Sequence, residues 1–131
     1  MKLAIPTTSN DGIIDITQHI EEVLEEQSVE NGVVTIFVHH TTAALSIMDL
    51  DPGTDLDFLN AIRHLLPHLT YRHPHNPSHA PDHILATLIG MSVSIPFENR
   101  HMTLGTWQRV VLVELDGPKT RQITLTLVES V

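Results

Sequence analysis

The sequence predicts an α+β fold in which an antiparallel β-sandwich carries two to three helices. In the first two-thirds of the chain, two segments have apolar residues at the three-and-four spacing of amphipathic helices. From residue 91 onward, apolar residues instead alternate with a period of two, as in half-buried antiparallel strands. A length of 131 residues and a hydrophobic content of 41% fit one domain, which we expect to span residues 1–131.

The first half of the chain is expected to alternate between strands and helices. Residues 13–16 have strand character, and Thr17 is a candidate cap for the helix that follows. Residues 33–38 are almost wholly apolar and β-branched, which is typical of a strand buried on both faces. Residues 45–48 are a second, shorter candidate strand. A turn at 51–54 then opens a helix whose predicted buried stripe is Leu56, Leu59, Ile62, Leu65 and Leu66.

The second half begins with a long loop. Pro67 ends the preceding helix, and three prolines forbid regular structure across residues 68–81. A short helix is expected at 82–89, with Gly90 as its carboxyl cap. Strands are predicted around 93–97, 111–115 and 123–127, separated by turns at 98–100 and 116–118. A loop this long in a compact domain is often functional.

Charge and composition exclude several classes of protein. The formal net charge of -9 opposes sequence-independent binding to nucleic acids and to anionic membranes. Cysteine is absent, which excludes disulfide scaffolds and thiol catalysis. The longest apolar run has strand length, and the N-terminal apolar run stops at Pro6, so we expect a cytoplasmic protein without a targeting segment.

Histidines are the first candidates for chemistry, because six of the ten fall between residues 64 and 83. Neutral imidazole is the commonest zinc ligand, and three histidines with one water form a usual catalytic site. Imidazoles also match zinc better than magnesium, which prefers oxygen ligands. The alternative is a polar loop that is merely rich in histidine, and no short-spaced zinc motif decides between the two.

Other polar residues lie at predicted turns. Asp49 and Asp51 precede a helix and could orient metal ligands, act as a base or simply cap the helix. Thr41 and Thr42 could bind phosphate or satisfy a turn. Arg121, after the turn at 116–118, is a scarce positive charge suited to an anionic ligand or to a neighbouring subunit.

Several short motifs, taken together, resemble the YjbQ family, whose members are often labelled secondary thiamine-phosphate synthase. The resemblance runs from about residue 12 to the end of the chain. Its motifs are His40-Thr41-Thr42-Ala43 before Asp51-Pro52, Tyr71-Arg72-His73, Pro81-Asp82-His83-Ile84, Leu104-Gly105-Thr106-Trp107-Gln108 and Glu114-Leu115-Asp116-Gly117-Pro118. One departure concerns Met48, where many relatives carry Glu, so that Asp49 or Asp51 would have to supply any acid–base chemistry.

The resemblance implies a homotrimer and a divalent metal, most simply zinc, held by His40, His73 and His83. Our leading hypothesis is a small enzyme in which His40 and Asp51 are catalytic and a phosphorylated small molecule is the substrate, with thiamine-phosphate synthase-like transfer as its activity. The expected substrate contacts are Thr41, Thr42, Trp107, Gln108 and Arg121, the last from a neighbouring chain. The alternatives are metal-assisted hydrolysis of a phosphate ester and a metal- or ligand-binding module without turnover.

Overall fold

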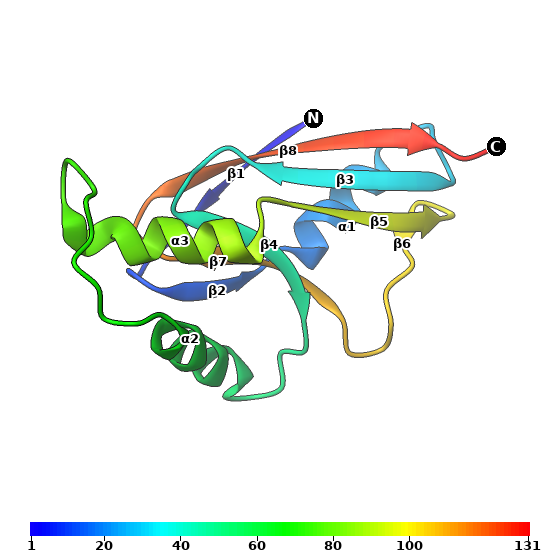
Figure 1. Ribbon diagram of the computed structural model, residues 1–131. Helices are drawn as coiled ribbons and strands as arrows, with labels where there is room; N and C mark the ends of the chain where they lie inside the picture. The colour runs from blue at the N-terminus through cyan, green and yellow to red at the C-terminus, as the bar shows by residue number, and fades with distance from the viewer.

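The computed structural model describes residues 1–131 and contains two antiparallel sheets and three α-helices (Figure 1). The five-stranded sheet has the order β1 (Lys2–Pro6), β8 (Thr120–Glu129), β3 (Gly32–Val38), β5 (Ser92–Glu98) and β6 (His101–Met102). The three-stranded sheet has the order β2 (Gly12–Asp15), β7 (Arg109–Glu114) and β4 (Ala43–Met48). The helices are α1 (Thr17–Glu25), α2 (Thr54–Leu65) and α3 (Ala80–Ile89), with a 3-10 turn η1 (Pro77–His79) before α3. The predicted α+β class is confirmed.

The larger core joins the inner faces of the two sheets. Val34 and Ile36 of β3 belong to the same buried cluster as Leu45 of β4 and Leu112 of β7. Helix α1 adds Ile20, which, like Leu24 one turn later, is fully buried. Burial of each large apolar side chain contributes about 1.5–3 kcal/mol, so this layer holds the sheets together.

A second core lies on the other face of the three-stranded sheet. Val111 and Val113 of β7 pack there with Leu59 of α2 and with Leu85 and Ala86 of α3. Figure 1 shows α2 and α3 on this side of the molecule, with the five-stranded sheet on the opposite side. The three α-helices have 9 to 12 residues, and none is long and apolar enough to cross a membrane.

Two predictions about burial are wrong. Residues 33–38 are not buried on both faces, because nothing covers the outer face of the five-stranded sheet and Val33 and Phe37 remain 39% and 42% exposed. The strand that is buried on both faces is β7, which lies between the two cores. The buried stripe of α2 is also narrower than predicted, since Leu56 and Leu65 are 67% and 73% exposed.

Local details differ at the ends of elements. Thr17 does not cap α1; the carboxylate of Asp15 accepts the Thr17 N–H at 3.0 Å, and the Thr17 hydroxyl accepts the Val110 N–H at 2.8 Å. Strand β1 was not predicted, because five residues ending at Pro6 carry little pattern of their own and owe their conformation to pairing with β8. Helix α3 starts at Ala80 with Pro81 near its first turn, where proline is tolerated.

Candidate functional site

A cavity of about 410 Å³ lies where β3, α3 and the β7–β8 turn meet, and we call it the histidine cavity. None of its lining residues is hydrophobic. They are His39, His40, Thr41, Thr42, His83, Asp116, Lys119 and Arg121. The topology explains this convergence: residues 39–42 connect β3 to β4, His83 is in α3, and residues 116–121 lead from β7 into β8. An all-polar lining favours a polar or charged ligand.

The floor of the histidine cavity is a buried ion pair. Arg121 is 1% exposed, and its Nε donates to both carboxylate oxygens of Glu114 at 3.0 Å. Its Nη2 donates to the hydroxyl of Thr42 at 2.9 Å, and Glu114 also accepts the Thr7 hydroxyl at 2.6 Å. We expected Arg121 to reach the site from a neighbouring chain. In the structure, Arg121 lines the cavity of its own chain, so no neighbour is needed to place it there.

His40 is fixed by strand β8. Its Nε2 accepts the backbone N–H of Gln122 at 2.9 Å, so in the neutral ring the proton is on Nδ1. Burial lowers the pKa of His40, and the nearby charge of Arg121 lowers this pKa further. His40 is therefore a neutral imidazole at pH 7 with one N–H to donate.

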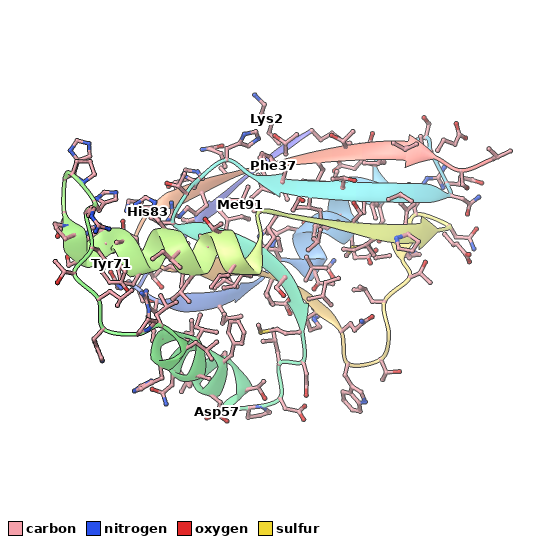
Figure 2. All side chains as sticks on the ribbon, viewed as in Figure 1. Lys2, Phe37, Asp57, Tyr71, His83 and Met91 are labelled. Carbon is pink, nitrogen blue, oxygen red and sulfur yellow. The ribbon has the colours of Figure 1, made fainter.

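His73 and His83 meet next to the histidine cavity. Their rings stack with centroids 4.7 Å apart and planes 24° apart, which joins the proline-rich loop to α3. The Nδ1 of His73 accepts the Asn76 N–H at 3.3 Å, and the Asn76 side chain in turn accepts the Ser78 N–H that starts η1. Figure 2 labels His83 on α3 and Tyr71 in the preceding loop at the same end of the molecule.

The three predicted metal ligands gather at one end of the fold without forming a ligand set. The group of donor atoms within 4.8 Å of one another consists of other residues. His40 and His73 each use one ring nitrogen to accept a backbone N–H. A neutral imidazole has only one ring nitrogen with a lone pair that can accept a hydrogen bond or bind an ion. His40 and His73 already use this nitrogen for a backbone N–H, so each would have to give up that hydrogen bond to bind an ion. In this arrangement the imidazoles do not fit a metal.

Asp51 and Trp107 line a different cavity, of about 260 Å³, together with Asp15, Asp49, Leu50, Thr106 and Arg109. Within one chain, then, the structure does not bring Asp51 to His40. Trp107 is 70% exposed at this second cavity. Gln108 holds the turn before β7, since its side-chain oxygen accepts the Gly105 N–H at 2.7 Å.

Comparison with known proteins places the chain in a family. The model of the UPF0047 protein YjbQ-like family matches residues 1–130. The chain belongs to the YjbQ family. A UPF0047 protein from Archaeoglobus fulgidus is 39% identical over 124 residues, covering 94% of this chain and 96% of the relative. The UPF0047 protein YugU of Bacillus subtilis is 34% identical over 120 residues and 91% of each chain.

The crystal structure of a YjbQ-like protein of unknown function from Sulfolobus solfataricus has the same fold. It superposes with a TM-score of 0.91 at 31% identity, over 99% of this chain and 96% of the other. The motifs that carry the resemblance do not all fall at one place in this chain. His40, Thr41, Thr42 and His83 line the histidine cavity, whereas the Asp-Pro and Trp-Gln motifs lie at the second cavity.

Three residues of the histidine cavity lie outside the predicted site. They are His39, Asp116 and Lys119. The pKa of Asp116 is lowered: burial alone would raise it, but the hydrogen bond and charge of Lys119 outweigh burial. In the sequence, Lys119 stands out only as a rare cation after a turn. Nothing in the sequence indicates that it pairs with Asp116.

Proposed function

We propose that the protein is an enzyme acting on a phosphorylated small molecule in the histidine cavity. The observation that carries this proposal is the lining of the cavity, which combines Lys119, Arg121, three imidazoles and two threonines with one carboxylate, Asp116, and no apolar residue. Lys119 is paired with Asp116 and Arg121 with Glu114, so the cavity offers an anionic ligand converging hydrogen-bond donors rather than a net positive charge.

Arg121 is the proposed anchor for the phosphate. Nε and Nη2 are committed to Glu114 and Thr42, and Nη1 makes no hydrogen bond within the protein. Arg121 lines the cavity, so Nη1 is the guanidinium nitrogen that remains free to donate to a phosphate oxygen. The Thr41 hydroxyl and the Lys119 ammonium would supply further donors to the same group.

His40 is the proposed hydrogen-bond donor to the leaving group. The β8 backbone fixes its tautomer, so the Nδ1–H of the neutral ring can donate a hydrogen bond to a leaving phosphate or pyrophosphate oxygen and stabilise the charge that develops there. The family resemblance suggests the reaction: a pyrimidine pyrophosphate is joined to a thiazole phosphate and pyrophosphate is released. Donors arranged around the leaving group are what such a transfer requires.

Metal-assisted hydrolysis of a phosphate ester is the second candidate. It rests on the family resemblance and on the gathering of His40, His73 and His83 at one end of the fold, although the stacked rings of His73 and His83 do not direct their nitrogens to a common point. Zinc at His40, His73 and His83 stays a prediction, since it requires His40 and His73 to release their backbone partners.

An assay of product release separates these functions. The purified chain is incubated with the pyrimidine pyrophosphate and thiazole phosphate, or with p-nitrophenyl phosphate, with and without a chelator. We expect chelator-insensitive release of pyrophosphate that falls about 100-fold or more in His40→Gln. The control is His64→Gln, because His64 is exposed on α2 and bonds only the Asn60 carbonyl.

The other outcomes are equally specific. Chelator-sensitive release of phosphate from p-nitrophenyl phosphate would favour the hydrolase. Calorimetric binding of inorganic pyrophosphate without turnover would identify a ligand-binding module. If pyrophosphate does not bind at all, or binds equally to wild type and Lys119→Gln, the histidine cavity is not the proposed anion site.

We also propose that the chain assembles as a homotrimer through the outer face of the five-stranded sheet. The middle of this face carries only uncharged side chains, among them Val33, Thr35, Phe37, Ser94, Pro96, Thr126 and Val128. Copies with a net charge of -9 repel one another, and an uncharged face is where they can approach most closely.

Light scattering after size-exclusion chromatography tests the trimer. Phe37→Asp should reduce the mass toward that of a single chain, because it buries a charge in the proposed interface. The matched control is Leu88→Asp, which alters a 68% exposed residue on α3. A monomeric wild type, or an unchanged mass for Phe37→Asp, would contradict the proposal.

A further inference from the structure

Three side chains outside the predicted metal site bring their donor atoms together. His79 ends η1, Asp82 lies in the first turn of α3, and Asp116 follows β7. Their ligand atoms all lie within 4.8 Å of one another. The side chains of Asp82 and Asp116 are 10% and 17% exposed, and that of His79 is 41% exposed. The cluster is thus partly enclosed but can be reached from solvent.

The spacing between His79 and Asp116 is that of two ligands of one ion. The Nδ1 of His79 lies 3.4 Å from Oδ2 of Asp116, which is longer than an ordinary hydrogen bond. Two ligands of a tetrahedral ion with bonds of about 2.0–2.1 Å are separated by about 3.3 Å. The two atoms are therefore as far apart as two ligands of one ion, and they are not hydrogen-bonded to each other.

The carboxylates keep free oxygen atoms. Arg63 contacts Oδ1 of Asp82, and Lys119 contacts Oδ2 of Asp116. The second oxygen of each carboxylate makes no hydrogen bond within the protein. Oδ2 of Asp116, the oxygen that lies 3.4 Å from His79, would have to exchange Lys119 for the ion. Lys119 is 46% exposed, so its ammonium can move away when an ion binds to Asp116.

We infer that His79, Asp82 and Asp116 form a divalent-cation site at the edge of the histidine cavity. One imidazole and two carboxylates suit a borderline ion such as Zn²⁺, Mn²⁺ or Co²⁺ better than Mg²⁺, which prefers oxygen ligands alone. The ion joins the start of α3, with the adjacent η1, to the β7–β8 turn, two segments that are distant in the sequence. The site does not depend on the proposed phosphate chemistry, although Asp116 also lines that cavity.

The neighbouring cation Lys119 allows a specific prediction. Lys119 competes with the ion for Asp116, so Lys119→Gln should bind the ion more tightly than wild type does. The same variant should bind inorganic pyrophosphate less tightly, because Lys119 is a proposed phosphate contact. Opposite changes in these two affinities separate the cation site from the proposed anion site.

Titration of the full chain with Co²⁺ tests the inference, with calorimetry for affinity and d–d absorption for coordination. His79→Ala should weaken binding at least tenfold, Lys119→Gln should strengthen it, and His40→Gln should leave it unchanged. His79 is partly exposed, so its replacement does not threaten the fold. Mixed nitrogen and oxygen ligands should give a spectrum that His79→Ala alters and His40→Gln does not.

Three results would overturn the site. The first is that the wild type does not bind Co²⁺. The second is that His79→Ala and wild type bind Co²⁺ with equal affinity. The third is that His40→Gln and His83→Ala lose binding but His79→Ala does not. The last result would place the ion at the histidines that the family resemblance indicates. Thermal melts of each variant without metal confirm that affinities are compared between folded proteins.

Discussion

Replacement of Glu114 by Gln should strongly destabilise the protein. Glu114 is 0% exposed, and its carboxylate accepts hydrogen bonds from Arg121, Thr7 and two backbone N–H groups. Gln keeps the shape but removes the negative charge, which leaves the buried guanidinium of Arg121 uncompensated. Loss of one partner of a buried pair costs about 3–5 kcal/mol. That is a large part of the roughly 5–15 kcal/mol that a domain has in total.

Urea unfolding at a fixed chain concentration measures this loss, because the stability of an oligomer depends on concentration. The matched control is Glu30→Gln, which removes an exposed pair with Arg100 and should cost at most about 1 kcal/mol. The double variant Glu114→Leu/Arg121→Met should lose less free energy of unfolding than the sum of the losses in the two single variants, since it leaves no charge buried alone. A loss below about 1 kcal/mol for Glu114→Gln, or additive single changes, would refute the reasoning.

Three further predictions follow from burial and local geometry. The pKa of His40, measured by NMR, should fall below the reference value of about 6.5. The contribution of neutral His40 to stability is then present above pH 6.5 and is lost as the pH falls through the lowered pKa of the folded state. A measured pKa of His40 at or above 6.5 would contradict this. Phe97→Ala should cost about 3–5 kcal/mol in urea unfolding, and Leu88→Ala, at a 68% exposed residue, less than about 1 kcal/mol. Gly32→Ala should cost about 3 kcal/mol, because its Cβ would lie 2.1 Å from the Val128 carbonyl, whereas Gly105→Ala meets only the flexible Gln108 side chain and should cost clearly less.

Periodicity predicted most elements because each pattern is local. The three-and-four spacing of apolar residues predicted α1, in which Ile20 and Leu24 are buried, and alternating apolar residues predicted the strands β5 and β8. The prediction was wrong where burial depends on a neighbouring layer. Val33 and Phe37 are as apolar as Val111 and Val113, but only β7 has packed layers on both sides.

Several of the expected site residues share one cavity. The motifs pointed to His40, Thr41, Thr42 and His83, and the scarcity of positive charge pointed to Arg121; these five residues line the histidine cavity. The same motifs pointed to Asp51 and Trp107, which lie at another cavity of the chain. Motifs specify which residues recur together in a family, but not the path of the chain between them.

By itself, the sequence determined the α+β class, the positions of the main helices and strands, and membership of the YjbQ family. Those properties depend on the period of apolar residues and on motifs that are short and contiguous. Only the tertiary structure decided that β7 is the central strand, that Arg121 is paired with Glu114 beneath the histidine cavity, and that His79, Asp82 and Asp116 meet. The geometry of these contacts follows from how the sheets and helices pack rather than from any local pattern, even where the residues, such as Glu114 and Arg121, are only seven positions apart.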